Sequence, residues 1–544
     1  MGADATSEPA KQDAEQVLGD STPTSPSEPA KPTPLVTFIV KRWRRLQRWV
    51  LWIFPNWGAV NRADLVYEQA HDVEENEETR VPPELELRVP MVWGCELYGP
   101  AEIDGLYKGL EKLEWGVVGR LGDQDGIAKW IRESRAYGQQ DAWLNGGRIV
   151  APNERGKYLA TYNFASLPEG VSYLDVQVFQ LSPSLTGVLI GFRLDDTVAQ
   201  RYEIEINRDR RTYRRRIRGS RAISIIGPEN QKKEAIASVR SSLRSLVTDW
   251  YKRNLPGYFS SLDRKVAFPI MELLSVKEGP VLHDPPTVPR IGRINWRWLL
   301  RNGRFSPYVW RSREHDGLQL LLADDSEGTY GSIITVAADE SRFPEENFKF
   351  LGGRSLDALI YLCSQELQYV LPNAAILEYL KEQTRYLNLS REQLKIARSG
   401  RGNLDRTLRT ITHFFDRTLG VPALAGELTR RANQRGRYER ELAALSTTDL
   451  RSDDPAPKLS DIFRSTTQVM ASRLAEEEGV MRGHFEQLSS ILSIHENVKV
   501  QRRIQMLTVL TLVVAVLSLL VALAGIHTLI DWLTSAWKHS SLAK

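Results

Sequence analysis

The feature that most constrains this chain is an uncharged apolar stretch near its C-terminus, Leu507 to Ile526, with the sequence LTVLTLVVAVLSLLVALAGI. A helix of about 20 residues extends about 30 Å, the thickness of a bilayer's hydrocarbon core, and satisfies its own backbone hydrogen bonds there. A helix of a soluble core would carry a polar face, and this stretch has none. We therefore predict a transmembrane helix over residues 507–533, followed by a short tail over 534–544.

The residues that flank the stretch indicate its orientation. Lys499, Arg502 and Arg503 precede it, and Trp532 and Trp537 follow it as interfacial aromatics. Basic residues favour the cytoplasmic side of a membrane helix. The opening MGADATSEPAKQDAEQ also lacks the charged start and apolar centre of a secretory signal. We expect a single-pass, tail-anchored protein with its N-terminal bulk in the cytoplasm.

Charge and cysteine content exclude several classes of protein. The net charge is only +4 over 544 residues, so any binding to polyanions must come from local clusters. Cys95 and Cys363 are the two cysteines of the sequence, too few for a disulfide framework or a four-cysteine zinc site. This content is typical of a reducing compartment.

The N-terminal part divides into three predicted segments. Residues 1–34 are rich in Ser, Pro, Ala and Glu and predict a disordered tail. Residues 35–55 contain LVTFIVKRWRRLQRWVLWIF, which predicts a basic amphipathic helix at a membrane surface, unless it packs on the stalk or on a neighbouring subunit. An acidic linker fills 56–81. The predicted membrane-surface residues are Lys41, Arg42, Trp43, Arg44, Arg45, Arg48, Trp49 and Trp52.

Residues 82–353 alternate short β-rich runs with amphipathic helices and predict an α+β fold, a mainly antiparallel sheet with flanking helices. A long helix is expected from Glu229 to Asn254, stopped by Pro256 and Gly257. Shorter helices are expected around Ile103–Leu110 and Ile127–Ile131. The expected strands are Met91–Leu97, Trp115–Val118, Lys157–Phe164, Tyr173–Leu181, Leu185–Leu194, Gln200–Asn207 with a return arm Thr212–Arg218, and the runs VAFPIMEL, YVWRSR, LQLLLA and SIITVAA.

The remainder of the chain predicts helices only. A helical bundle over 354–458 comprises Leu356–Leu371, Ala374–Ser399, Asn403–Leu419 and Ala423–Leu445. A stalk helix over 459–506 carries apolar residues three to five apart, from Leu459 to Val498. If it enters the membrane segment unbroken, one helix of about 70 residues results, with Gly479 and Gly483 as its weakest points. The apolar face favours a homo-oligomer through the stalk, or packing against the preceding helices.

The join from Glu496 to Ile526, ENVKVQRRIQMLTVLTLVVAVLSLLVALAGI, resembles the point where the stalk of CorA-like magnesium transporters enters the membrane. The resemblance implies an oligomer whose stalk helices line a pore, with a Gly-Met-Asn loop before a second spanning helix. This sequence departs from that pattern, because His527 and Thr528 follow Ile526 where the loop would stand. The residues from there to Lys544 are too few to span a bilayer again.

A dense arginine cluster occurs in RDRRTYRRRIRGSR, with a single acid and Tyr213 among its residues. Such a cluster can bind anionic lipid head groups, an acidic partner or, less favoured, nucleic acid. The alternative is a solvated hairpin in which Glu203 and Glu205 pair with arginines across the strands. A second Arg–Trp mixture follows in RIGRINWRWLLRNGRF. The candidate anion-binding residues are Arg208, Arg210, Arg211, Arg214, Arg215, Arg216, Arg218 and Arg221.

Candidate catalytic groups are few. The sequence contains no P-loop, dinucleotide loop, GxSxG, HExxH or CxxC motif. Glu314, His315 and Asp316, with Asp324 and Asp325 across a predicted hairpin, form the best acid–base cluster, although turn chemistry explains it as well. His484 and His495 fall on the stalk as polar positions. We predict no catalytic residue, no metal site and no cofactor.

The sequence as a whole favours a membrane-anchored cytoplasmic sensor, scaffold or effector-positioning protein. Its partners would be the bilayer, anionic lipid head groups, further copies of the chain and an unidentified protein bound by the α+β domain. A CorA-like divalent-cation conduit is the second hypothesis. An enzyme with an unrecognised site is the third.

Overall fold

The computed structural model describes residues 42, 43, 46, 49, 65–115, 126–153, 163–216, 223–262, 268–279, 281, 282, 295–300, 309–322, 333–399, 409, 412–415, 418, 420–434, 436–447 and 457–540. The chain divides into two compact units. Unit 1 combines Met1–Gln69 with Thr212–Ile226, and unit 2 combines Ala70–Arg211 with Gly227–Lys544.

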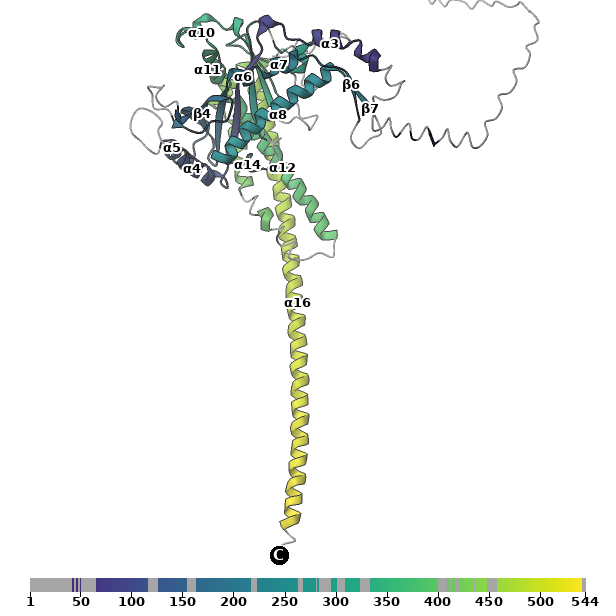
Figure 1. Ribbon diagram of the computed structural model, residues 1–544. Helices are drawn as coiled ribbons and strands as arrows, with labels where there is room; N and C mark the ends of the chain where they lie inside the picture. Colours follow the sequence, from purple (N-terminus) through teal and green to yellow (C-terminus); the bar gives the residue numbers. More distant parts are fainter. Residues whose placement is uncertain are drawn as a thin grey trace, which may run out of the picture. The chain divides into compact units, whose positions relative to one another are not determined.

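Unit 2 is built on a mixed sheet of ten strands in the order β12-β9-β10-β11-β8-β1-β5-β4-β2-β3 (Figure 1). The central strand β1 pairs antiparallel with β5 on one side and β8 on the other. Within this sheet β8–β11 and β2–β3 are parallel, and the other described pairs are antiparallel. The strands are β1 (Arg88–Tyr98), β2 (Ala142–Val150), β3 (Asn163–Phe164), β4 (Val171–Ser182), β5 (Leu185–Leu194), β8 (Ile270–Val276), β9 (Trp310–Ser312), β10 (Leu318–Leu321), β11 (Ile333–Asp339) and β12 (Leu445–Thr447).

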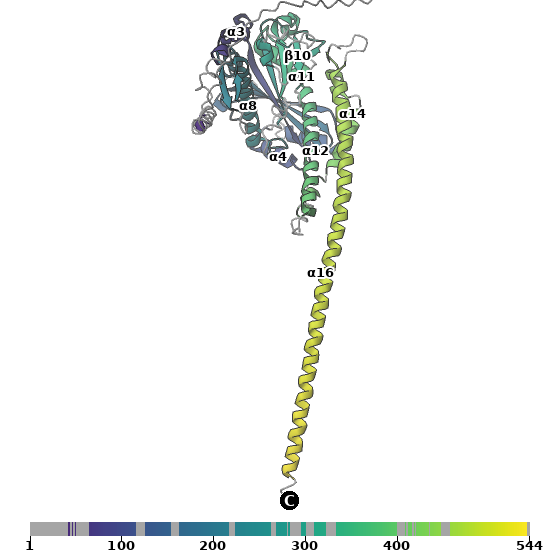
Figure 2. The ribbon, with the colours of Figure 1, turned by 90° about the vertical axis from the view of Figure 1, so that its right-hand side faces the viewer.

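The centre of the sheet is covered on both faces. β1 and β8 are buried along almost their whole lengths instead of alternating, which is typical of strands with helices on both sides. Helix α8 (Pro228–Asn254) lies on one face, where a Cβ on Gly94 would come within 2.4 Å of Val247. Helix α12 (Val370–Ser399) lies on the other side of the sheet (Figure 2).

The remaining helices of unit 2 pack around this sheet in one continuous hydrophobic core. Helix α14 is attached to the β4–β5 turn by Glu427, whose carboxylate accepts hydrogen bonds from Ser182 Oγ (2.7 Å) and from the backbone N–H of Ser184 (3.0 Å). These helices are α3 (Asp72–Glu78), α4 (Ile103–Lys112), α5 (Gly126–Ala136), α6 (Asp196–Ala199), α7 (Arg201–Asn207), α9 (Trp296–Leu299), α10 (Glu345–Lys349), α11 (Leu356–Leu367), α14 (Val421–Asn433) and α15 (Arg437–Leu442), with short 3-10 turns η1 (Pro83–Leu85) and η5 (Glu340–Arg342).

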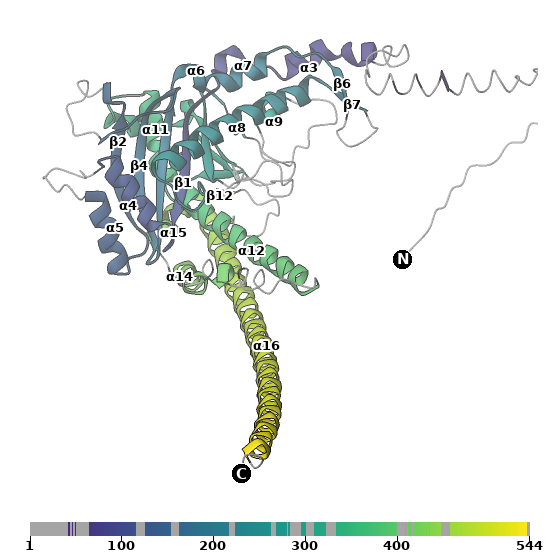
Figure 3. The ribbon, with the colours of Figure 1, turned by 60° about the horizontal axis from the view of Figure 1, so that its bottom comes forward.

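The last helix, α16 (Leu459–Ser540), runs for 82 residues without a break. Its first half packs against α12, α14 and α15, and the rest continues beyond them (Figures 1 and 3). Leu459, Leu474 and Phe485 are buried, and the ring of Phe485 stacks on Phe414 at 4.3 Å between centroids. Gly479 and Gly483 therefore do not interrupt α16.

Unit 1 contains a two-stranded antiparallel hairpin, β6 (Tyr213–Arg216) and β7 (Ile223–Ile226). Residues 65–69 of this unit are helical. The side chain of Gln69 donates a hydrogen bond to the carbonyl of Thr212 at 2.8 Å, which joins the N-terminal part to the hairpin.

Several predicted elements are confirmed and others are wrong. The strands around Met91–Leu97, Tyr173–Leu181 and Leu185–Leu194 and the long helix from Glu229 are confirmed. The predicted strand Gln200–Asn207 is wrong, because α7 is a helix that buries Tyr202 and Ile206, one turn apart. The predicted helix Ala423–Leu445 is also wrong as one element, since it divides into α14, α15 and the edge strand β12. The strand predicted at Trp115–Val118 lies mostly outside the described residues.

Candidate membrane-contact sites and buried charge networks

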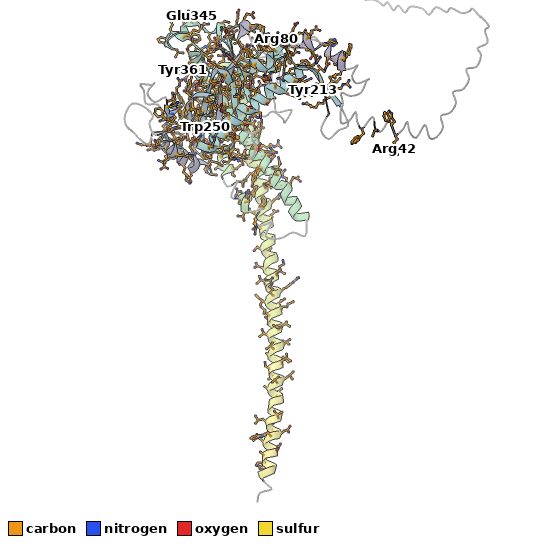
Figure 4. The ribbon with its side chains drawn as sticks, in the orientation of Figure 1. Arg42, Arg80, Tyr213, Trp250, Glu345 and Tyr361 are labelled. Carbon is orange, nitrogen blue, oxygen red and sulfur yellow. The ribbon has the colours of Figure 1, made fainter. Side chains whose placement is uncertain are left out.

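The C-terminal part of α16 is the one helix, among the described residues, that is long and apolar enough to cross a membrane. This part spans Asn497–Trp537, has a mean hydropathy of 2.9 in its most apolar window, and none of that window is buried against the protein. Trp532 and Trp537 are 69% and 82% exposed. Figure 4 shows side chains along this part of α16 pointing outward with no other element beside them.

The predicted membrane-surface helix is described at four positions. Arg42, Trp43, Leu46 and Trp49 are helical and exposed, with Trp43 at 65% and Trp49 at 59%. Their spacing of three residues puts Trp43, Leu46 and Trp49 in one row along the helix, which we call the tryptophan row. The other predicted residues of this surface lie outside the described part of the chain: Lys41, Arg44, Arg45, Arg48 and Trp52.

The first arginines of the dense cluster are held by Glu205 and Asn76 of unit 2. Arg208 and Arg210 both form ion pairs with Glu205 on α7, the former at 3.1 Å. The backbone of Arg210 exchanges two hydrogen bonds with the side chain of Asn76 on α3, at 2.9 and 2.7 Å. The carbonyl of Arg211 accepts from Gln231 at 2.8 Å. The segment from Arg208 to Arg211 is therefore basic and also bonded to α3 and α8.

The next arginines of the cluster belong to unit 1. Arg214, Arg215 and Arg216 lie on β6, and their cross-strand partners are Ile225, Ser224 and Ile223. The predicted pairing with Glu203 and Glu205 is wrong, because those residues lie on α7 and β6 pairs with β7 instead. Arg218 and Arg221 lie outside the described residues. The structure thus divides the sequence cluster between two units.

The acid–base cluster suggested by the sequence is mostly tied to structural partners. His315 stacks on Phe343 at 5.1 Å and its Nδ1 lies 3.1 Å from the side-chain amide of Asn347. Burial lowers the pKa of His315. Asp316 pairs with Arg342 at 3.3 Å. Asp324 and Asp325 lie outside the described residues, and within that described part no three His, Cys, Asp or Glu side chains are placed to hold a metal ion.

The side chain of Glu366 lies next to this cluster and was not predicted as part of it. Ser312 Oγ donates to Glu366 Oε1 at 2.8 Å and accepts the backbone N–H groups of Glu314 and His315 at 3.1 and 3.0 Å. Burial, and to a lesser extent the neighbouring Glu314, raises the pKa of Glu366 to about 7. The side chains of His484 and Glu486 on α16 are exposed and take no part in it.

The sheet contains a buried ion pair that sequence reasoning missed. Arg240 on α8 donates to Glu272 Oε1 on β8 through Nε at 2.9 Å and Nη2 at 2.5 Å. The hydroxyls of Tyr202 and Thr335 donate to the same carboxylate at 2.5 and 3.0 Å. Arg240 also donates to the carbonyl of Leu300 at 2.6 Å. Four elements of the fold, α7, α8, β8 and β11, therefore meet with Leu300 at one satisfied charge pair.

A second buried acid, Glu96 on β1, holds a loop in place. Its carboxylate accepts three backbone N–H groups: Leu97 at 3.0 Å, Phe259 at 2.7 Å and Ser260 at 2.8 Å. Its side chain is fully buried, and this burial raises its pKa to about 7 even though the hydrogen bonds act in the opposite direction. No sequence signal marks Glu96, because a single acid in an apolar strand resembles an outward-facing residue.

A cavity of about 420 Å³ lies between α12 and α16. Its lining combines Leu389 and Met470 with Lys381, Arg385, Glu392 and Arg473. Lys381 pairs with Glu378 at 2.9 Å and Arg473 with Glu477 at 2.8 Å, so these two cations are already neutralised along their own helices. The cavity offers no concentrated charge to a ligand.

Among the described residues, the exposed apolar surfaces include the C-terminal part of α16 and the tryptophan row. Comparisons of the chain with models of known protein families, with curated proteins and with solved structures find no match.

Proposed function

We propose that this protein is a membrane-anchored, non-enzymatic sensor, scaffold or effector-positioning protein, whose α+β unit binds a protein partner at the bilayer. The observation that carries the proposal is that α16 belongs both to the hydrophobic core and to the candidate membrane span. Phe463 and Phe485 are buried in its first half, whereas the apolar window within Asn497–Trp537 has no buried residue. A bilayer would cover that apolar surface.

The continuity of α16 supports a role in positioning or transmission. A helix unbroken over 82 residues resists bending better than a loop of the same length. A change in how α14 packs on the first half of α16 would therefore be passed along the helix towards the span. Lys499, Arg502 and Arg503 favour a cytoplasmic location for the large units.

The homo-oligomer belongs to the same proposal. Val469, Val480 and Ile494 are between 51% and 66% exposed on α16. Anchoring in one bilayer would bring copies together in parallel, so these side chains can meet the same positions of a second chain. Crosslinking between cysteines placed at Val480 or Ile494 tests this, and a product that stays monomeric at every reagent concentration contradicts it.

The anchor itself is tested by adding charge to the apolar stretch. Val513→Arg with Leu517→Arg places two arginines in the bilayer, each costing about 2.5–3.5 kcal/mol at a helix centre. We expect the variant to leave the membrane fraction on alkaline extraction. Gln468→Arg with Ser472→Arg is the matched control, because these exposed positions are also four residues apart but lie on the part of α16 outside the apolar stretch, and it should remain bound.

Orientation and transport are separate measurements on the full chain. A cysteine placed at Ala543 in sealed vesicles should react with an impermeant maleimide from the side opposite to Met1, with little background because Cys95 and Cys363 are buried. A label on the same side as Met1 would contradict a single pass. Release of divalent cations from liposomes that contain the pure protein would favour the cation-conduit hypothesis instead.

A further inference from the structure

Three cations lie on α16 immediately before its apolar stretch. Lys499, Arg502 and Arg503 are all exposed, and no hydrogen bond or ion pair joins their side chains to another residue that the structure describes. Residues three and four apart are neighbours on a helix, so these side chains fall within about 100° of arc. We call this surface the cation face. Its charge is open to a ligand.

The sequence around the cation face supplies little negative charge. Residues 487–530 contain the three cations and a single acid, Glu496, one turn before Lys499. One acid cannot balance three cations. By contrast, Arg473 and Arg482 on the first half of α16 each pair with a glutamate one turn away. The cation face therefore keeps a surplus of positive charge where the helix leaves the packed part of the protein.

The surface that continues the cation face towards the C-terminus is aliphatic. Met506, Leu510, Val514 and Leu517 follow Arg503 by three, seven, eleven and fourteen residues, which places them along the same side of the helix. Their side chains are between 54% and 78% exposed. We call them the aliphatic strip. One side of α16 therefore has cations at its upper end and a continuous apolar surface below them.

The spacing along the helix matches the depth of the parts of a phospholipid. Arg503 stands four residues and Lys499 eight residues before Leu507, about 6 and 12 Å along the axis. The headgroup region extends roughly 5–8 Å beyond each side of the hydrocarbon core. With Leu507 at the edge of that core, Arg503 lies at the level of the phosphates, and Lys499 reaches them with its long side chain.

An anionic phospholipid matches both ends of this surface. Its phosphate accepts charge-assisted hydrogen bonds from arginine, and its acyl chain covers the aliphatic strip. Nucleic acid or an acidic peptide would match the cations alone and would leave Met506 and Leu510 in water. A zwitterionic headgroup matches less well, because its own ammonium group would lie among three cations.

We propose that the cation face and the aliphatic strip together bind an anionic phospholipid, in the leaflet next to the packed part of α16. The inference rests on the proposed function, because a bilayer is what brings lipid to this segment. It goes beyond an anchor, since an apolar span alone has no preference between headgroups. Binding requires no covalent step and no further ligand.

The test uses the full chain in phosphatidylcholine liposomes and measures energy transfer to a lipid labelled on its acyl chain. The donor dye is attached at Gln501→Cys, an exposed position about 160° round the helix from Lys499. Cys95 and Cys363 do not compete because both are buried. At equal low mole fraction, labelled phosphatidylserine should accept more energy than labelled phosphatidylcholine. Equal transfer to the two lipids overturns the proposal.

Substitution of the cations gives the expected size of the effect. Arg503→Gln should lower the preference for phosphatidylserine about fivefold, and the triple variant with Lys499→Gln and Arg502→Gln should abolish it. Glutamine is a good helix former, so these exposed positions should stay helical. Arg502→Lys with Arg503→Lys keeps the charge and should keep most of the preference. A loss as large as that of the triple variant would contradict a site based on charge.

The matched control removes the same charge from unit 2. Arg313→Gln, Lys349→Gln and Arg430→Gln change one lysine and two arginines at exposed positions outside α16. This variant should prefer phosphatidylserine as the parent chain does. If it loses the preference as well, the total charge of the protein attracts the lipid and the cation face is not the site.

The outcomes separate the lipid site from the anchor. Flotation with the liposomes reads the anchor, so a chain that floats but shows no preference keeps the anchor and loses the lipid site. A parent chain that fails to float contradicts the proposed function, and the lipid site with it. Added salt should weaken the preference, because exposed charges are screened. A preference that is equal at low and high salt would contradict binding through the three cations.

Discussion

Glu96→Gln provides the sharpest check of the packing around the sheet. Burial raises the pKa of Glu96 from its ordinary value of 4.5 to about 7. Between these values the folded protein keeps a proton that the unfolded chain has lost, so stability falls as the pH rises through this window. The difference corresponds to about 3 kcal/mol, present in full below pH 4.5 and lost above about pH 7.

The glutamine variant removes this titration and keeps the side-chain shape. Its amide oxygen can still accept from Leu97 and Phe259, but its NH2 group meets the N–H of Ser260, which leaves donors unmatched at a cost of about 1–3 kcal/mol. The variant should therefore be less stable than the parent chain near pH 5. Towards pH 8 the difference should move by about 3 kcal/mol in favour of the variant.

Thermal unfolding of the full chain in a nonionic detergent, followed by tryptophan fluorescence, measures this difference. For a unit of this size roughly 1–2 °C per kcal/mol is expected, so the gap between the two midpoints should change by several degrees across the pH range. Glu366, whose pKa is also raised to about 7, titrates in both proteins and cancels. Glu345→Gln, at an exposed position labelled in Figure 4, should run parallel to the parent chain. Parallel curves for Glu96→Gln would refute the reasoning.

Three further substitutions probe other contacts by the same unfolding assay. Arg240→Leu leaves the carboxylate of Glu272 buried without its cation and should cost about 3–5 kcal/mol, most of which the added Glu272→Leu should recover; additive losses would contradict this. Phe485→Ala should cost about 3–5 kcal/mol and speed hydrogen exchange in the first half of α16, whereas the exposed neighbour His484→Ala should change neither; equal effects would show that Phe485 does not hold the helix. Glu205→Gln should cost less than about 1 kcal/mol, since its arginine partners are accessible to water, and a larger loss would mean that this pair is central to the connection.

Local sequence patterns predicted the elements in which an apolar periodicity extends over many residues. Residues such as Leu459, Leu474 and Phe485 recur at helical spacing and are the buried face of α16. The strand predicted at Gln200–Asn207 shows how a short pattern misleads. Tyr202, Ile204 and Ile206 alternate as in a strand, but Tyr202 and Ile206 are also one helical turn apart, and these two are buried while Ile204 is 50% exposed.

Features that depend on distant partners left no local signal. β12 is three residues long and is a strand because it pairs with β9, more than a hundred positions earlier in the chain. Arg240 and Glu272 each resemble surface residues until α8 is placed across β8. For the candidate anion-binding residues, the composition identified the arginines but not their neighbours: Glu205 pairs with Arg208 and Arg210, and the β6 arginines lie opposite isoleucine and serine on β7.

Because α16 is unbroken, its length fixes the distance and the rotation angle between its packed part and its apolar stretch. Phe485 is the last buried side chain described along the helix, and Leu507 begins the apolar stretch about 33 Å further on. Each residue inserted between them would raise the packed part by about 1.5 Å and turn it by about 100° relative to the span, and seven would nearly restore the starting angle. If α16 spans a bilayer as we propose, the length of this segment would set both the distance between the packed part and the lipid and the direction in which the packed part faces.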